Sequence, residues 1–200
     1  MKEFFRNLES LVPLGQQAQE DIAHYISILT VPAHTRLIIA GQLQPALYYV
    51  RDGVLRNFEM QDGKEWTNWF FKKGDFAFSV ESLLLGEPAS ANLESCTKVV
   101  LYLIARSDFQ ALTIRHDSIR NLSKVLAGIY LKQAKKQVYY SSHLSAWQRY
   151  QLFVADNPYI ATRVQSNHAA SFLGIFPGSV SRFRKRISTE DRHYYNRSIT

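Results

Sequence analysis

The chain has 200 residues and a formal net charge of +7, and 46% of its residues are hydrophobic. This length and hydrophobic content are enough for one large domain or two small ones with a real core. Residues 1–117 hold eleven Lys/Arg and fourteen Asp/Glu, whereas residues 118–200 hold thirteen and three. This asymmetry indicates a sensing or scaffolding part joined to a part that binds a polyanion. The single cysteine, Cys96, excludes a disulfide framework and a zinc finger and favours a reduced, cytoplasmic setting. No apolar run approaches the ~20 residues needed to span a bilayer, so no membrane role is expected.

The front of the chain is predicted to form a β-roll preceded by two short helices. Apolar residues recur at helical spacing over 3–12 and 16–29. From Val31 to Ala105 the pattern changes to short β-branched and aromatic runs separated by glycines. Strands at this spacing are typical of a sandwich or jelly roll. The expected strands are 37–39, 47–50, 54–60, 66–71 and 99–104, with a hairpin turn at Asp62-Gly63.

Residues 118–140 are predicted to form one long helix, because this part of the chain has no proline and Gly128 is its only glycine. At 1.5 Å per residue the helix would be about 35 Å long. Such a helix cannot be buried wholly against a domain of this size, so it either bridges two domains or pairs with a second copy. We favour pairing, as a homodimer. The apolar seam at three-four spacing consists of Ile119, Leu122, Leu126 and Ile129.

The basic part of the chain contains a predicted helix-turn-helix at 166–187. A capping box at Ser145 begins the preceding helix, which stops at Pro158. Gly174 would end the first helix of the pair, because glycine adopts the left-handed conformation without steric cost. In this motif the second helix lies in the major groove of double-stranded DNA; the alternative is a helical hairpin with a solvated basic face. The candidate DNA-contacting residues are Ser179, Ser181, Arg182, Arg184, Lys185 and Arg186.

Nothing in the sequence indicates an enzyme. The motifs of serine hydrolases, dinucleotide-binding folds and phosphate-binding loops are absent. The six histidines are scattered, and none lies in the predicted strands between Val54 and Ile104, where a jelly-roll metal enzyme needs its ligands. We therefore assign no catalytic residue, no metal ligand and no cofactor.

The order of these parts resembles the cyclic-AMP receptor / fumarate-nitrate regulator (Crp/Fnr) family of bacterial transcription factors. The resemblance is most specific in LYYVRDGVLRNF at 47–58, DGKEWTNWFFKKGDF at 62–76 and ASFLGIFPGSVSRFRKRI at 170–187. It implies a homodimer that reads a palindromic DNA site, a small-molecule effector bound in the roll, and contact with RNA polymerase.

The expected fold class is α+β, and the resemblance gives it three parts. Residues 1–117 form a double-stranded β-helix, a jelly roll like that of cyclic-nucleotide-binding domains, with flanking helices. Residues 118–141 form the dimerisation helix, and residues 142–200 form the helix-turn-helix DNA-binding domain.

The expected effector pocket departs from the cyclic-nucleotide pattern. Members of the family that bind cyclic AMP hold its ribose with a glutamate and its phosphate with an arginine. Here Ser79 falls near the glutamate position, with Glu81 two residues further on, and Ala89 stands in place of the arginine, followed by Ser90. An alanine supplies neither charge nor donors for a phosphate. The roll is therefore predicted not to bind cyclic AMP, and its effector is unknown.

The start of the second helix departs from the family as well. Phe176 replaces a threonine that would cap the helix, and Gly178 replaces a glutamate that could contact a base. Arg182 remains the main base-reading candidate, and the sequence leaves open whether the tail after Ile187 is ordered or loose. Two hypotheses remain: a dimeric, sequence-specific transcription regulator, or a jelly-roll ligand sensor or interaction module whose DNA-binding domain has decayed.

Overall fold

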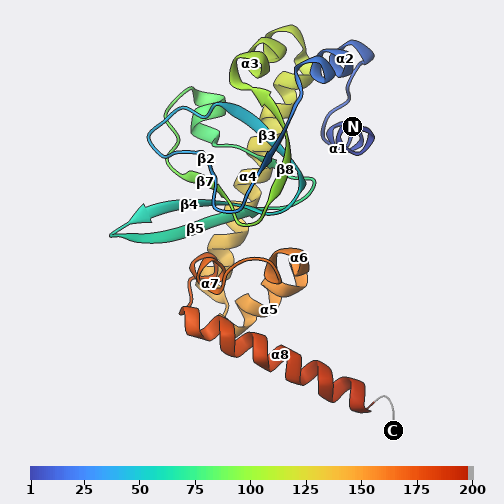
Figure 1. Ribbon diagram of the computed structural model, residues 1–200. Coiled ribbons are helices and arrows are strands. Elements are labelled where there is room, and N and C mark those ends of the chain that lie inside the picture. Colours follow the sequence, from blue (N-terminus) through green and yellow to red (C-terminus); the bar gives the residue numbers. More distant parts are fainter. Residues whose placement is uncertain (198–200) are drawn as a thin grey trace.

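The computed structural model describes the backbone of residues 1–197 and the side chains of residues 1–187. Three parts follow one another along the molecule (Figure 1). A β-roll with α1–α3 occupies one end, the long helix α4 runs beside the roll and beyond it, and α5–α8 occupy the other end. The predicted α+β architecture is confirmed.

The roll consists of two four-stranded antiparallel sheets, with strand orders β1-β8-β3-β6 and β2-β7-β4-β5. The strands are β1 (Ser27–Val31), β2 (Arg36–Ile38), β3 (Ala46–Asp52), β4 (Leu55–Gln61), β5 (Lys64–Phe71), β6 (Phe76–Ala77), β7 (Asn92–Ser95) and β8 (Val99–Ala105). The predicted hairpin turn between β4 and β5 is confirmed, with Asp62 and Gly63 at φ 51° and 72°. Positive φ at both residues matches the right-handed twist of the flanking strands.

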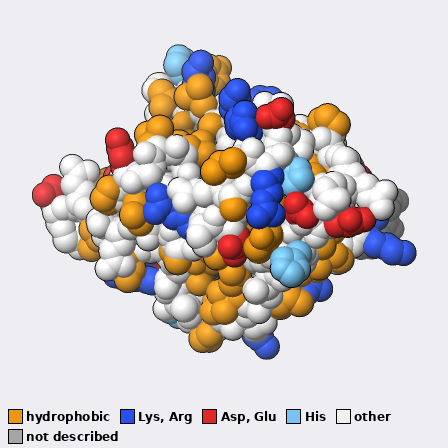
Figure 2. Space-filling model, turned by 90° about the horizontal axis from the view of Figure 1, so that it is seen from above, with side chains coloured by type: hydrophobic (Ala, Val, Ile, Leu, Met, Phe, Trp, Pro, Cys, Tyr) orange, Lys and Arg blue, Asp and Glu red, His pale blue; other side chains and the backbone are white. Residues whose placement is uncertain are grey.

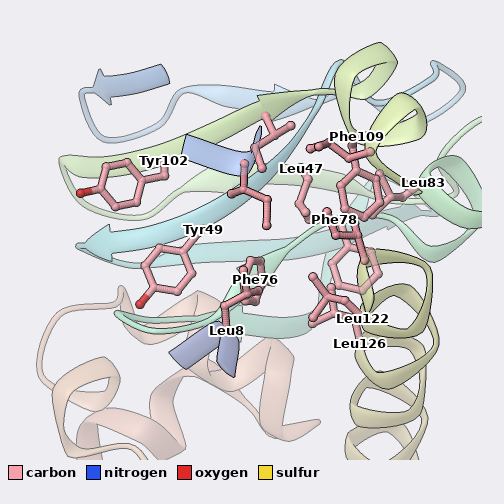
Figure 3. Packing of buried hydrophobic residues seen from close by; sticks show 14 of the residues in the cluster. Leu8, Leu47, Tyr49, Phe76, Phe78, Leu83, Tyr102, Phe109, Leu122 and Leu126 are labelled. Carbon is pink, nitrogen blue, oxygen red and sulfur yellow. The ribbon is translucent and has the colours of Figure 1, made fainter. Parts of the chain in front are cut away.

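Strand β3 explains why one apolar run in the sequence is continuous instead of alternating. Tyr48 and Val50 belong to the core between the two sheets. Leu47 and Tyr49 point to the opposite side and belong to a second core, made with the helices (Figure 3). Because successive side chains of a strand point to opposite faces, a strand covered on both faces is apolar throughout.

The helices confirm the main predictions and correct some boundaries. They are α1 (Lys2–Leu11), α2 (Gln16–Tyr25), α3 (Arg106–Arg115), α4 (Asp117–His143), α5 (Ala146–Asp156), α6 (Pro158–Ala161), α7 (Ser166–Leu173) and α8 (Pro177–Arg197), with a π-helix at Glu81–Leu85. The helix expected over 16–29 ends at Tyr25, because residues 27–31 pair with β8 as a strand. The long helix is confirmed and is slightly longer than predicted.

Two helix ends show how local chemistry sets boundaries. The capping box of α5 is present: Gln148 N donates to Ser145 Oγ at 3.3 Å, and Ser145 N donates to Gln148 Oε1 at 2.9 Å. The backbone of α8 continues as a helix beyond Ile187 to Arg197, a point that the sequence left open. Residues 198–200 lie outside the described part of the chain.

One face of α4 is covered by the roll of the same chain. Ile119, Leu122 and Leu126 are only 1%, 2% and 4% exposed. They pack with residues such as Phe109 in the second core, which the helices form with the roll. Figure 3 shows Leu122 and Leu126 pointing from α4 into this core. The assignment of these three residues to a dimer seam is therefore corrected, because a seam needs side chains that the subunit itself leaves uncovered. Of the predicted seam, only Ile129 is exposed, at 37%.

Surface charge differs between the two ends of the molecule. The end face that carries α2 and α3, seen in Figure 2, shows acidic and basic side chains interspersed. The segment between Asp156 and Glu190, which forms most of the opposite end, contains no acid. Among the described residues, no helix combines the length and the apolar character needed to cross a membrane.

Candidate nucleic-acid interface and effector pocket

The predicted helix-turn-helix is present in α7 and α8. Gly174 takes the left-handed conformation at φ 61° and ends α7, and Ile175 N donates back to Ala170 O at 3.0 Å. Ala170 and Val180 are almost completely buried where the two helices meet. The small side chain of Ala170 allows the two helices to cross closely. Helix α8 lies at the end of the molecule farthest from α3 (Figure 1).

The outer face of α8 carries most of the predicted DNA-contacting residues. Ser181, Arg182, Lys185 and Arg186 are exposed, and Ser179 is half-buried. Arg182 Nη2 donates to Ser179 Oγ at 3.1 Å, which orients the guanidinium along the exposed side of the helix. The guanidinium of Arg186 lies 4.3 Å from the ring centre of Trp147. This face can offer cations and hydroxyl donors to a polyanion.

Arg184 does not belong to this face. Its Nη2 donates to Ala161 O and Val164 O at 3.0 and 3.1 Å, and its Nη1 donates to Ser166 Oγ at 3.0 Å. These bonds stabilise the turn between α6 and α7 and direct the guanidinium into the domain. The prediction that Arg184 contacts DNA is corrected, because its donors are engaged by carbonyl groups of the same subunit.

The helix-turn-helix is held against the edge strand β5. Ser171 Oγ donates to Glu65 O at 2.8 Å and accepts from Thr67 N at 2.7 Å, so one side chain satisfies two backbone groups of the strand edge. Gln137 Nε2, on α4, donates to Phe172 O at 2.6 Å. The position of α7 is thus linked to both the roll and the long helix.

Arg149 joins the end of α4 to the turn of the motif. Its Nη1 donates to Ser141 O and Leu144 O, both at 3.1 Å, and its Nη2 donates to Gly174 O at 3.2 Å. Helix C-termini favour such cations, because their last carbonyl groups lack intrahelical partners. This role of Arg149 cannot be read from the sequence, since nothing in its local pattern shows which carbonyl groups come within reach.

Three of the four predicted effector-pocket residues lie together in the roll. Ser79 Oγ donates to Glu81 Oε2 at 2.6 Å, and Ser90 Oγ donates to Glu81 Oε1 at 2.9 Å. Burial alone would raise the pKa of Glu81, but the hydrogen bonds from Ser79, its own backbone and Ser90 outweigh burial and lower that pKa. Ala89 is buried close by in the chain, and its backbone pairs with Gly41 and Gln42. The polar side chains of Ser79, Glu81 and Ser90 therefore satisfy one another's hydrogen-bonding groups.

Gln44, which the sequence analysis did not single out, occupies the interior of this site. It is 1% exposed; Ser79 N donates to its Oε1 at 2.7 Å, and its Nε2 donates to Ala46 O at 3.1 Å. Its backbone N donates to Ser82 Oγ at 2.6 Å. An amide that bonds the Ser79 backbone takes up a donor that could otherwise serve a ligand oxygen.

A separate cleft, of about 630 Å³, lies between β5, α4 and α7. Aromatic and amide side chains line much of it, among them Trp69, Tyr130, Gln133, Gln137 and Phe172. The cleft leaves no signal in the sequence, because its walls come from segments far apart in the chain. A ligand here would touch the roll, the long helix and the helix-turn-helix at once.

Arg56 and His168 form a buried polar cluster beneath α7. Arg56 Nη2 donates to Glu65 Oε2 at 2.6 Å and to Glu94 Oε1 at 3.0 Å. His168 Nε2 lies 3.9 Å from Glu65 Oε2. Burial lowers the pKa of His168, and the charge of Arg56 lowers it further, while Glu65 and Glu94 act in the opposite direction. The cluster therefore favours a neutral imidazole.

Within the described residues, no three or more His, Cys, Asp or Glu side chains lie close enough together to hold a metal ion. Burial raises the pKa of the Cys96 thiol to about 12. The thiol thus stays protonated near neutral pH and behaves as a small apolar group.

Comparison with known proteins agrees with this geometry. Residues 28–116, which span the roll, match the family described as the cyclic nucleotide-binding domain. No curated protein matches the sequence.

Several solved structures share the fold across roll, long helix and helix-turn-helix. FixK2 from Bradyrhizobium japonicum has a TM-score of 0.70 at 19% identity, over 83% of this chain and 86% of that one. CLP from Xanthomonas campestris, described as a c-di-GMP-responsive global regulator, has a TM-score of 0.69 at 17% identity, over 88% and 93%. A protein from Eubacterium rectale, described as belonging to the crp/fnr family, has a TM-score of 0.70 at 14% identity, over 88% and 85%. Residues 28–116 are therefore similar to cyclic nucleotide-binding domains, and the chain shares its overall fold with these solved structures, one of which is described as a regulator of the crp/fnr family.

Proposed function

We propose that this chain is a dimeric transcription regulator that reads a palindromic DNA site through the major groove, with an effector other than cyclic AMP. The observation that carries the proposal is the exposed outer face of the first half of α8, residues 177–187, where no acid occurs and Ser181, Arg182 and Lys185 lie side by side along the helix. Cations on such a face neutralise phosphates and release counterions, which supplies affinity, and an arginine that reaches a guanine supplies specificity.

Pairing of α4 is supported by an apolar stripe on the side that the roll leaves uncovered. Leu131 and Val138 are 57% and 65% exposed. Together with Ala127 and Ala134 they form a row at four-three-four spacing, in the order 127, 131, 134, 138. This is the spacing of a coiled-coil seam, and the two alanines allow close approach of a second helix. A two-fold axis along this stripe would present two α8 helices to successive major grooves, about 34 Å apart.

An effector is proposed for the cleft between β5 and α4. Ala134 and Val138 line its edge, so a partner helix docked on the stripe would help to enclose a ligand there. Aromatic and amide walls suit an uncharged planar molecule better than a phosphate. Because the cleft also reaches Phe172 on α7, occupancy would influence the position of the helix-turn-helix.

The alternative is a ligand sensor whose DNA-binding domain has decayed. It is favoured by the first turn of α8, where Pro177 and Gly178 offer no polar side chain to a base and Phe176 is exposed. Both hypotheses share the roll, so DNA binding discriminates between them.

The test is to select duplexes from a random pool and to measure affinities for the best site and for random DNA. Arg182→Ala should weaken binding to the best site by about tenfold or more, and binding to random DNA far less, because a bidentate arginine–guanine pair discriminates against the wrong base. Arg163→Ala removes the same charge from an exposed residue that stacks on Tyr159 and serves as the matched control. Equal losses on both DNAs would reduce Arg182 to a phosphate contact. If no duplex is selected, the decayed-domain alternative holds.

A further inference from the structure

Phe176 has the most exposed large hydrophobic side chain among the described residues, at 84%. It directly precedes α8 and follows Ile175, which packs into the core of the helix-turn-helix domain. Anchoring Ile175 in that core turns the next side chain outward. Trp66, across the cleft beside the turn, does not cover the phenyl ring, as the exposed fraction shows.

The position of Phe176 normally favours a different kind of residue. A serine, threonine, aspartate or asparagine before a helix accepts a hydrogen bond from the first turn. Here only the backbone contributes: Ser179 N donates to Phe176 O at 2.9 Å. The phenyl ring therefore neither caps α8 nor packs against the described part of the chain, and its exposure to water is unfavourable unless another molecule covers it.

The surroundings of Phe176 point to DNA as that molecule. Pro177 and Gly178 extend the apolar surface through the first turn, and Ser181 and Arg182 are exposed in the next. No acid occurs in the chain between Asp156 and Glu190, and the roll contributes Lys64 and Glu65 to the cleft that Phe176 lines, so cations outnumber acids around this apolar tip. In helix-turn-helix proteins the start of the second helix meets base edges. The methyl group of thymine is the apolar group on those edges, and phenylalanine is among the side chains that contact it.

We propose that Phe176 is a specificity-determining residue that packs against one thymine methyl group in each half-site. The proposal rests on the DNA-binding function proposed above and deepens it. Apolar contact at the start of α8 replaces the polar base contacts that Gly178 cannot make, and Arg182 reads a neighbouring base pair. The preferred half-site then contains a thymine whose methyl group matters to affinity.

The experiment uses the full chain and its best selected duplex. Each thymine is replaced in turn by deoxyuridine, which removes only the methyl group. Burying one methyl-sized group changes affinity about fourfold, so one position in each half-site should show this loss, and replacing both should cost about sixteenfold. In Phe176→Ser the same replacements should change affinity by less than about 1.5-fold, because the side chain that covers the methyl group is gone.

Two controls keep the result interpretable. Phe176→Ser should fold at least as well as the wild type, since serine is a preferred N-cap, and thermal melting checks this. Ile114→Ser removes a comparably exposed apolar side chain, at 77%, on α3 and should keep the full thymine dependence. The proposal is overturned if no thymine-to-uracil change weakens wild-type binding, or if Phe176→Ser shows the same losses. A wild-type protein that selects no duplex would overturn the DNA-binding function first, and this proposal with it.

Discussion

Arg56 is a charged residue placed where the fold would otherwise be apolar. Its side chain is 2% exposed, lies 4.1 Å from the ring centre of Phe58, and is held by Glu65 and Glu94. Glu94→Gln should lower the free energy of unfolding by about 3 kcal/mol, because it removes the buried carboxylate and leaves the guanidinium of Arg56 with only the partly exposed Glu65 as a charged partner. Urea unfolding measures this. Glu65→Gln is the matched control and should cost less, since the Glu65 side chain is 38% exposed and water can replace it. Equal losses would contradict this view of the pair.

His168 should make stability depend on pH. Its pKa is lowered from the usual 6.5, chiefly by burial, with Arg56 and His34 adding to the effect and Glu65 and Glu94 opposing it. Below pH ~6.5 the unfolded chain therefore binds a proton that the folded chain does not, so stability falls as pH drops through this range. Melting curves between pH 5 and 8 should show this slope, and His168→Gln should flatten it. A variant with an unchanged slope would assign the effect to other groups.

At the scale of elements, α4 has two apolar faces with different roles. Leu131→Asp places a charge in the exposed stripe and should convert dimers to monomers with little change in melting temperature. Leu126→Asp instead buries a charge in the core between α4 and the roll and should unfold the protein, since Leu126 is 4% exposed. Sedimentation and thermal melting separate the two outcomes. A wild-type protein that is monomeric at micromolar concentrations would contradict pairing through this stripe.

At the scale of the whole molecule, we predict that cyclic AMP and cyclic GMP do not bind. Gln44 bonds the Ser79 backbone inside the roll, and Ala89 offers no charge to a phosphate. Moving a charged phosphate out of water costs several kcal/mol unless such groups replace its hydration. A ligand at a hundred times its dissociation constant would stabilise the fold by about 2.7 kcal/mol. Each kcal/mol of stabilisation raises the melting temperature of a chain of this size by roughly 2–4 °C.

Sub-millimolar cyclic AMP should therefore leave the melting temperature unchanged. A shift of several degrees would show that the roll binds phosphate by another route. Arg106, which lies beside Gly86 at the end of the π-helix, would be the first cation to test in that event.

Local patterns in the sequence determined much of this protein. Short β-branched and aromatic runs separated by glycines indicated the roll, a proline-free segment indicated α4, and Ser145, Gln148 and Gly174 marked helix ends. These predictions hold because strand periodicity, capping and left-handed glycine depend on residues within a few positions of one another. The order of these elements was then sufficient for the family resemblance.

Only the tertiary structure decided which side chains are free to act. An amphipathic pattern shows that Leu122 and Leu126 are buried, but it cannot show that their own roll, and not a partner helix, covers them. The run of basic residues in α8 includes Arg184, yet its guanidinium donates hydrogen bonds to carbonyl groups twenty or more residues away in the chain. Gln44 occupies the expected pocket because the fold brings it beside Ser79, thirty-five residues away in the chain. Long-range contacts of this kind depend on how the elements pack, and no local pattern encodes them.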